Sequence, residues 1–255
     1  MQDAYLEVNR AIWDKVGPSL RATALPRWGP LALPEDELKL LGDLRGQRVL
    51  ELGCGDGGSL VWLAEAGAGE LWGLDISASQ LIAARQRLDD RQFSARLIQS
   101  SFEEAQALPE EHFDLAVSVF ALGWAIGLDS AMARIARCLR PGGRLVFSWE
   151  HPFFSLLAER DGQVIVGEPY PGDGRPQHRS FQGVEVVLVA RSLGDWIAAL
   201  RGSGLILDGL IEPGLDERQL AEHHREPGYV YSFAKASRLP TTFIVAAHKP
   251  GASQG

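Results

Sequence analysis

The sequence predicts an α/β fold in which a mainly parallel sheet is covered by helices on both faces. Three observations support this prediction. Short, nearly all-apolar segments alternate with amphipathic ones between residues 45 and 150, a glycine-rich turn follows the first of the apolar segments, and the 255-residue chain is 45% hydrophobic. Apolar segments without polar alternation are typical of parallel strands that are buried on both faces. A chain of this length can bury one large core, so we expect a single domain over residues 1–255.

The elements of the predicted core follow one another in regular order. Strands are expected at Arg48–Leu52, Glu70–Asp75, 95–99, 113–119 and 144–149, and helices at 59–66, 79–88 and 130–139. The last of these helices carries Met132, Ile135 and Leu139 at three- and four-residue steps, which places them on one face. Pro141-Gly142-Gly143 then interrupts the helical pattern. Residues 45–150 are therefore expected to form a ligand-binding core.

The segments on either side of this core have other patterns. Residues 1–44 show helical spacing up to residue 20 and again at 35–41, and we expect them to cap the core. Residues 151–191 are rich in proline, glycine and aromatic side chains, with one alternating segment at 184–190, and are expected to cover a substrate. Residues 192–255 return to regular structure, with a predicted helix at 192–201 and strands at 205–211 and 241–248.

Charge and cysteine content restrict the expected partners. Lys and Arg total 25 against 33 Asp and Glu, and the resulting net charge of −8 does not favour nucleic-acid phosphates. Cys54 and Cys138 show no metal-ligand spacing, so neither a disulfide framework nor a metal is expected. No signal-peptide pattern is visible, and no apolar run reaches the roughly 18 residues of a membrane helix. We expect a soluble, cytoplasmic monomer or homodimer without membrane or nucleic-acid partners.

The most informative stretch, Val49-Leu50-Glu51-Leu52-Gly53-Cys54-Gly55-Asp56-Gly57-Gly58, joins a predicted strand to a predicted helix. Its glycines allow a sharp turn and let a ligand lie against bare main chain. Gly53, Gly55 and Gly58 also fit the dinucleotide pattern G-x-G-x-x-G, so the glycines alone do not identify a cofactor. A tight turn without a ligand is the alternative.

Two carboxylates near this loop are more specific. Glu51 would repel a pyrophosphate but suits an ammonium or sulfonium group, and S-adenosylmethionine carries both cations and no phosphate. Asp75 ends the second predicted strand, where a carboxylate can accept hydrogen bonds from ribose hydroxyls or cap the following helix. Ser101 and Phe102 follow the third predicted strand and are candidates for holding and covering an adenine.

With these motifs the sequence resembles the class I S-adenosylmethionine-dependent methyltransferases, in their small-molecule branch. The loop from Glu51 to Gly57 resembles the family's E/D-x-G-x-G-x-G motif. Three further stretches resemble its ribose-binding strand end, its fourth strand and its L-x-P-G-G-x-L turn: Leu71-Trp72-Gly73-Leu74-Asp75-Ile76-Ser77, Phe113-Asp114-Leu115-Ala116-Val117-Ser118-Val119 and Leu139-Arg140-Pro141-Gly142-Gly143-Arg144-Leu145. The resemblance implies a Rossmann-like fold: a seven-stranded, mainly parallel sheet with helices on both faces, an antiparallel last strand, and an inserted lid region after strand 5.

The resemblance also implies S-adenosyl-L-methionine as cofactor and S-adenosylhomocysteine as product. Gly53 and Gly55 would face the methionine part, and Asp75 the ribose. Ser100 and Ser101 stand where the family often has Asp for the adenine. The full set of expected cofactor contacts is Tyr5, Trp13, Glu51, Gly53, Cys54, Gly55, Asp75, Ile76, Ser101, Phe102 and Phe120.

Candidates for catalysis and acceptor binding lie beyond the fourth and fifth predicted strands, where α/β folds place ligands. His151 is the expected base because its unperturbed pKa lies near working pH, although a loop histidine bonded to backbone is an equal alternative. Glu150 is expected to orient His151 or to bind a cationic acceptor, and His178 is a second candidate base. The aromatic residues expected to contact the acceptor are Trp124, Phe154, Tyr170 and Tyr229.

The predicted function is methyl transfer, by in-line displacement, to an oxygen or nitrogen atom of a small, aromatic or heterocyclic metabolite. Such a reaction depends on holding the two reactants collinear and partly dry. A tRNA or protein acceptor is one alternative, and a non-catalytic adenosyl-binding or scaffold protein is another. A nicotinamide-dependent oxidoreductase is a third, which Glu51 and the Leu-Arg-Pro-Gly-Gly turn disfavour.

Overall fold

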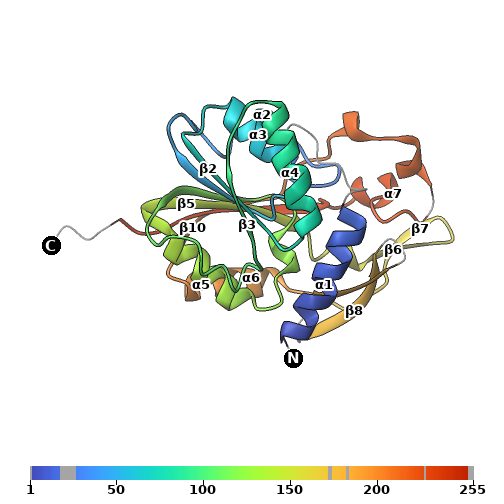
Figure 1. The fold of residues 1–255 in the computed structure, drawn as a ribbon. Helices are drawn as coiled ribbons and strands as arrows, with labels where there is room; N and C mark the ends of the chain where they lie inside the picture. The colour runs from blue at the N-terminus through green and yellow to red at the C-terminus, as the bar shows by residue number, and fades with distance from the viewer. Residues whose placement is uncertain (1, 18–26, 172–173, 182–183, 227, 252–255) are drawn as a thin grey trace.

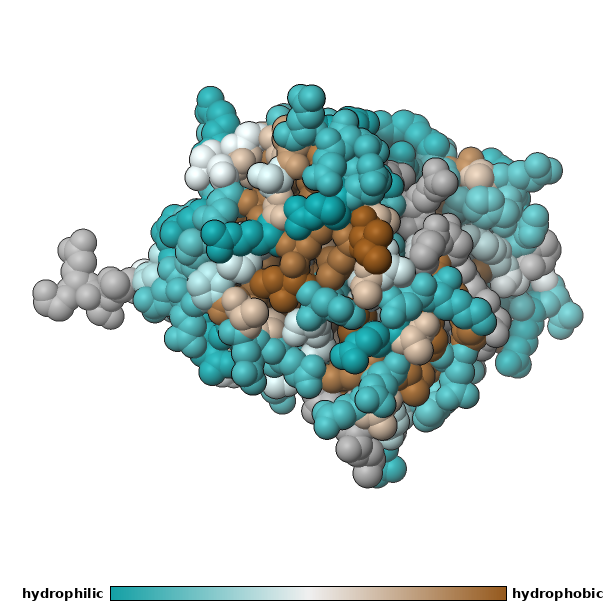
Figure 2. All heavy atoms as spheres, viewed as in Figure 1, coloured by the Kyte–Doolittle hydropathy of each residue, from teal (hydrophilic) through white to brown (hydrophobic). Residues whose placement is uncertain are grey.

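A single seven-stranded sheet forms the centre of the molecule, with the strand order β10-β11-β5-β4-β1-β2-β3 (Figure 1). The structure is a computed structural model, and it describes residues 2–17, 27–171, 174–181, 184–226 and 228–251. Figure 2 shows one face of the molecule, on which hydrophilic side chains dominate and a band of hydrophobic ones crosses the middle. No helix within the described residues is long and apolar enough to span a bilayer.

The strands of the sheet begin and end close to the predicted positions. They are β1 (Arg48–Leu52), β2 (Glu70–Asp75), β3 (Arg96–Gln99), β4 (Phe113–Ser118), β5 (Leu139–Glu150), β10 (Ile206–Ile211) and β11 (Thr242–His248). The first five are parallel, and β11 is antiparallel to both β5 and β10, which confirms the expected antiparallel last strand. Strand β5 starts earlier than predicted because the pairing with β4 shifts register at the Pro-Gly-Gly turn, where Gly142 has φ +75°.

Helices cover both faces of the sheet, as predicted. One face carries α2 (Glu35–Leu38), α3 (Gly58–Glu65) and α4 (Ala78–Asp90), and the other carries α5 (Leu128–Cys138) and α6 (Leu193–Gly202). Along β1, Val49 packs into the first layer and Leu50 into the second, because successive strand residues point to opposite faces. The core is therefore divided by the sheet into two apolar layers.

Helix α2 is shorter than the predicted helix at 35–41. Lys39 has φ +50°, a left-handed conformation that ends the helix. The Glu35 carboxylate accepts hydrogen bonds from the backbone N–H groups of Leu40 and Leu41, at 3.1 and 2.7 Å, and from the Trp28 indole. The side chain thus satisfies donors that another helical turn would have used.

The segment after β5 holds more strand than the sequence pattern indicated. Two separate antiparallel pairs occur, β6 (Leu157–Arg160) with β7 (Gln163–Val166), and β8 (Pro176–Phe181) with β9 (Val184–Val189), of which only β9 was expected. Helix α1 (Gln2–Val16) lies beside the β8–β9 pair and close to α4 (Figure 1). Short helices complete the described chain: η2 (Leu122–Trp124), η3 (Phe154–Leu156), η4 (Glu217–Gln219), η5 (Glu222–Arg225) and α7 (Phe233–Ala236).

Candidate functional site

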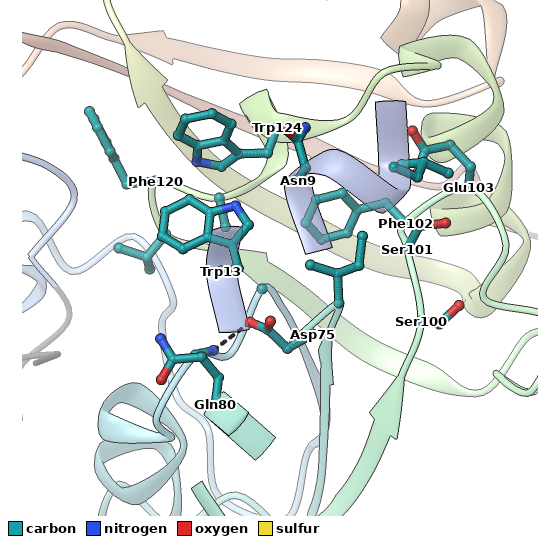
Figure 3. Close-up of a pocket in the computed structure, with 16 residues that line it drawn as sticks. Asn9, Trp13, Asp75, Gln80, Ser100, Ser101, Phe102, Glu103, Phe120 and Trp124 are labelled. Atoms are coloured by element: carbon teal, nitrogen blue, oxygen red, sulfur yellow. Dashed lines mark hydrogen bonds between the residues drawn. The ribbon is translucent and has the colours of Figure 1, made fainter. Parts of the chain in front are cut away.

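A pocket of about 750 Å³, its open mouth included, lies at the carboxyl ends of β1, β2 and β4 (Figure 3). This is the edge at which parallel α/β sheets bind ligands, and the volume suits a ligand of cofactor size. The lining residues come from five segments: Leu6, Asn9 and Trp13; Gly53 and Gly55; Asp75, Ile76 and Gln80; Ser100, Ser101, Phe102 and Glu103; Val119, Phe120, Ala121 and Trp124. In Figure 3, Phe120 lies at one end and Glu103 at the other.

The glycine loop forms the floor of the pocket. Gly53 has φ +74° and Gly55 has φ +51°, and a Cβ atom on Gly53 would stand only 2.3 Å from the Cβ of Ala121. Side chains other than hydrogen are therefore excluded at Gly53 both by conformation and by space. The backbone N–H groups of Gly53 and Cys54 donate to the Leu74 carbonyl, at 2.7 and 3.0 Å, so the loop is tied to the end of β2.

Asp75 is held between the loop and the start of α4. Its Oδ2 accepts the Gly55 N–H at 2.8 Å and its Oδ1 accepts the Ser77 N–H at 2.9 Å. Burial raises the pKa of Asp75 above its ordinary value, and the hydrogen bonds from Ser77 and Gly55 oppose that shift. Each carboxylate oxygen can accept a further hydrogen bond, so the fixed Asp75 can bind two hydroxyl groups in the pocket.

Glu51 is a buried carboxylate directly before the loop, and it is only 2% exposed. Burial is the main cause that raises its pKa to about 8; the charges of Asp75 and Asp56 add to the shift, and a hydrogen bond from Ser59 opposes it. Its Oε2 has no hydrogen-bond partner among the described residues. Such an oxygen is costly to leave unpaired, and a cation bound above the loop would relieve that cost.

Two lining residues also carry unpaired buried oxygens. Oε1 of Gln80 and Oε2 of Glu103 lack a hydrogen-bond partner within the part of the chain that the structure describes. The other Glu103 oxygen, Oε1, accepts the N–H groups of Ile126 and Gly127 at 2.8 and 3.0 Å, which fixes the carboxylate in place. Together with Glu51, these oxygens fit a ligand that presents hydrogen-bond donors along its whole length.

Phe120 forms the wall at the end of β4 in a strained conformation. Its φ is +52°, a region that residues other than glycine rarely adopt. Its N–H donates to the Ser148 hydroxyl at 3.1 Å, and its ring centroid lies 5.1 Å from that of Trp149. Strain of this kind concentrates at functional sites, where the surrounding structure enforces it.

Helix α1 covers the pocket. The Asn9 side chain donates to the Val187 carbonyl at 2.8 Å and accepts the Val187 N–H at 2.9 Å, which joins α1 to β9. Asp14 accepts hydrogen bonds from the Ser77 hydroxyl and the Ser79 N–H, at 2.7 and 3.1 Å, which joins α1 to the start of α4. The position of α1 over the pocket thus depends on a few specific polar contacts.

Replacing Asn9 by Ala is expected to loosen α1 because the buried N–H and carbonyl of Val187 lose their partner. The cost of leaving such groups unsatisfied is about 1–3 kcal/mol. Amide hydrogen exchange over residues 2–16 should become about tenfold faster or more, while Glu7→Ala, an exposed change in α1, should leave it unchanged. Equal exchange rates in the two variants would show that Asn9 does not anchor the helix.

Comparison with known proteins agrees with this geometry. Residues 50–147 match the model of a family described as "Methyltransferase domain". The structure of an S-adenosylmethionine dependent methyltransferase from Mesorhizobium loti superimposes with a TM-score of 0.67 and 26% identity, over 83% of this chain and 95% of that one. The chain carries a class I S-adenosylmethionine-dependent methyltransferase domain. The cofactor of this domain is S-adenosylmethionine.

Two curated relatives match over part of their length. A malonyl-[acyl-carrier protein] O-methyltransferase of Enterobacter lignolyticus is 38% identical over 104 residues, which are 41% of this chain and 39% of the relative. An S-adenosyl-L-methionine-dependent Diels-Alderase of Talaromyces variabilis is 32% identical over 175 residues, 62% of this chain and 60% of the relative. The chain therefore spans no more than 60% of the length of either relative.

The residues of the methyltransferase domain fit its cofactor. S-adenosylmethionine presents an ammonium group, two ribose hydroxyls and an adenine amino group as donors. The unpaired oxygens of Glu51, Gln80 and Glu103 and the fixed carboxylate of Asp75 supply acceptors. The missing Cβ at Gly53 leaves bare main chain at the floor of the pocket.

The structure gathers most of the expected cofactor contacts of the methyltransferase domain in one pocket. The expected residues that line it are Trp13, Gly53, Gly55, Asp75, Ile76, Ser101, Phe102, Phe120 and the expected acceptor contact Trp124. Glu51, in β1, and Cys54, in the loop, are buried and lie outside the lining. Tyr5 is also outside it, because its ring points to His178, with centroids 6.1 Å apart.

The histidines expected to act as bases lie outside the lining of this pocket. His151 is 1% exposed, its Nε2 is 2.8 Å from Oε1 of Glu212, and its Nδ1 accepts the Phe153 N–H at 3.2 Å. Burial lowers the pKa of His151, and the contact with Glu212 opposes the shift. Nε2 thus connects the end of β5 to the segment after β10, while Nδ1 is bonded to the local backbone, as in the backbone-bonded alternative. His178 is exposed on β8 and pairs with Glu185 at 2.7 Å.

Three of the residues expected to contact the acceptor also lie outside the pocket lining. Phe154 is buried and stacks on Tyr231, with ring centroids 5.8 Å apart. Tyr170 is 41% exposed and stacks on Phe153 at 4.7 Å. Tyr229 packs against two neighbouring histidines, with its ring centroid 5.0 and 5.4 Å from theirs. None of the three lines the pocket.

Several functional positions were missed in the sequence. Leu6 and Asn9 share a helix face with Trp13 at steps of three and four residues, so the pattern that indicated Trp13 could have found them. Gln80 and Glu103 carry no such signal, because only the fold places their oxygens in the pocket. The other missed lining residues are Val119 and Ala121. The sequence also contains a Tyr-x-x-x-Lys spacing, Tyr231 to Lys235, a pattern associated with hydride transfer by nicotinamide-dependent enzymes, but neither residue lines the pocket.

Proposed function

We propose that this protein transfers the methyl group of S-adenosylmethionine to an oxygen or nitrogen atom of a small, aromatic or heterocyclic metabolite. The observation that carries the proposal is the buried carboxylate of Glu51 directly before the glycine loop, whose Oε2 has no partner among the described residues, with Asp75 fixed nearby. A cation and a ribose satisfy this pair, whereas a pyrophosphate would offer no positive charge to balance the buried Glu51. Glu51 therefore argues against a nicotinamide cofactor, whereas Asp75 suits the ribose of either cofactor.

The bound cofactor would supply an electrophilic methyl group on its sulfonium. Glu51 would hold the ammonium, Asp75 the ribose hydroxyls, and Glu103 with Ser101 the adenine end. Helix α1 would cover the ligand, with Trp13 packed edge-on against Trp124 at a centroid distance of 5.1 Å. Positioning and exclusion of water are the main contributions that a methyl transfer needs from a protein.

A small acceptor is supported by the closure of the pocket. Residues 1–44, through α1, and residues 151–191, through β9, are proposed to cover the site, because Asn9 joins the two over the cofactor. The aromatic wall of Phe120 and Trp124 favours a flat acceptor. A malonyl-acyl-carrier-protein O-methyltransferase among the relatives supports oxygen as the methylated atom. The net charge of −8 disfavours a tRNA acceptor.

Titration with S-adenosylhomocysteine by calorimetry, beside NADH, tests the cofactor assignment. Asp75→Ala is expected to weaken S-adenosylhomocysteine binding by about 1–3 kcal/mol, because two buried hydrogen bonds to a charged group are lost. Asp43→Ala, which removes an exposed carboxylate paired with Arg45, should bind like the wild type. Stronger binding of NADH than of S-adenosylhomocysteine would overturn the proposal.

Transfer itself is tested with methyl-labelled S-adenosylmethionine and a panel of phenols, aryl amines and heterocycles. Label is expected in at least one small acceptor. Because one relative is named a Diels-Alderase that depends on the same cofactor, binding can occur without transfer. Tight cofactor binding with no label transferred across the panel would contradict methyl transfer and favour a non-transferring role.

A further inference from the structure

A second polar cluster lies beside the pocket, where the end of β5 meets residues 231–235. The Tyr231 hydroxyl donates to Oε2 of Glu150 at 2.8 Å. Lys235 is 8% exposed, and its Nζ lies 5.0 Å from the centroid of the Phe154 ring. The Phe154 ring is parallel to that of Tyr231 within 9°. The cluster is therefore built from packed rings that hold the hydroxyl and the carboxylate together.

Aromatic contacts connect this cluster to the pocket. The Tyr231 ring centroid is 6.4 Å from that of Phe120, which lines the pocket at the end of β4. The ring centroid of Trp149, the residue before Glu150, lies 5.1 Å from that of Phe120 and 5.6 Å from that of Trp124. Glu150 and Tyr231 are both partly exposed. The Glu150 carboxylate is thus linked, through the Tyr231 ring, to the Phe120 wall of the pocket.

The charges around Glu150 suit a group that exchanges a proton. Burial raises the pKa of Glu150, while the hydrogen bond from Tyr231 and the charge of Lys235 lower it. Burial raises the pKa of the Tyr231 hydroxyl well above its ordinary value, so Tyr231 stays protonated and keeps donating. Burial lowers the pKa of Lys235, and the charges of Glu150 and of Glu159, in β6, oppose that shift. The adjacent His151 is paired with Glu212.

We propose that Glu150 accepts the proton of a hydroxyl-bearing aromatic acceptor, and that Tyr231 is the positioning residue that holds the Glu150 carboxylate. The inference rests on the proposed methyl transfer. As the acceptor oxygen forms its bond to the methyl carbon, the carbon–sulfur bond breaks and its electron pair stays on sulfur. The hydroxyl proton passes to Oε1 of Glu150. The products are a methyl ether, a neutral thioether and a protonated Glu150, so charge and atoms balance.

The pH profile of methyl transfer to the phenols of the panel tests this assignment. In the wild type, the rate should rise with pH as Glu150 loses its proton. Glu150→Gln should lose that limb and slow transfer by about 10²–10⁴-fold, the usual contribution of a general base. Tyr231→Phe should move the limb to higher pH, because the lost hydrogen bond favoured the ionised carboxylate, and should recover the wild-type rate at high pH.

Controls separate this inference from the function on which it rests. Asp208→Asn, which changes a carboxylate paired with His248 at the sheet edge, should keep the wild-type profile. An acid limb in Glu150→Gln like that of the wild type would overturn the role of Glu150 while leaving methyl transfer intact. If no phenol is methylated, the panel is added to the S-adenosylhomocysteine complex with ¹³C-labelled glutamate. A Glu150 Cδ resonance that no phenol moves would also overturn the assignment, whereas absent S-adenosylhomocysteine binding would refute the proposed function itself.

Discussion

Glu51→Gln is expected to weaken S-adenosylmethionine and S-adenosylhomocysteine binding by about 1.5–3 kcal/mol, roughly a 10- to 150-fold rise in Kd. Both ligands carry the ammonium group that we assign to Glu51, and the amide removes its charged partner while keeping its shape. Calorimetry at pH 8 measures the change. Glu65→Gln, an exposed carboxylate paired with Arg91, is the control and should bind like the wild type. Unchanged affinity in Glu51→Gln would show that the ammonium lies elsewhere.

The raised pKa of Glu51 predicts a pH dependence with a definite sign. Between its ordinary value of 4.5 and about 8, the folded protein without ligand keeps the Glu51 proton while the unfolded chain has lost it. The folded state then binds more protons, so this group makes the free energy of unfolding fall as pH rises through that window. Glu51→Gln should lack this fall, and urea titrations of both proteins at pH 5, 6.5 and 8 measure it. Parallel curves for the two proteins would contradict the raised pKa.

Cofactor binding should lower the raised pKa of Glu51. A bound ammonium favours the ionised carboxylate, so binding below pH 8 is expected to release a proton from Glu51. Calorimetry in buffers that differ in ionisation enthalpy detects the release in the wild type and its loss in Glu51→Gln. Equal proton release by the two proteins would place the titrating group elsewhere in the pocket.

Gly53→Ala is expected to abolish measurable cofactor binding and to lower the free energy of unfolding by roughly 2–5 kcal/mol. Two costs add at this position. An alanine at φ +74° is strained, and its Cβ would stand 2.3 Å from the Cβ of Ala121, beside the strained Phe120. Relief of that overlap must move either the loop or the wall at the end of β4. Chemical denaturation and calorimetry measure the two consequences.

Gly46→Ala is the matched control for this prediction. Gly46 has φ +72°, nearly the same as Gly53, but a Cβ there would meet no atom within 4 Å. The Gly46→Ala variant should lose only the conformational strain energy, about 1–2 kcal/mol, from its free energy of unfolding, and cofactor binding should be unchanged. Equal losses in the two variants would mean that the contact with Ala121 has no effect and that conformation alone requires glycine at position 53.

The sequence by itself determined the fold class and most of the residues that line the pocket. Buried parallel strands are mostly apolar, and Val49, Leu50 and Leu52 show this directly in the sequence, with Glu51 as the functional exception. The loop could be located because a turn with φ above zero favours glycine. Asp75 could then be identified because it ends the next strand. Local constraints of this kind leave a signature in adjacent residues.

Only the tertiary structure decided which distant side chains reach the pocket. His151 follows β5 as expected, but its ring is bonded to Glu212, 61 residues later, and lies outside the pocket lining. Gln80 and Glu103 line the pocket, and folding buries one oxygen of each without a partner among the described residues, a condition that no local pattern records. Tyr231 meets Glu150 across 81 residues for the same reason. Burial and long-range pairing arise from packing, so residues that act through them become visible only once the chain is folded.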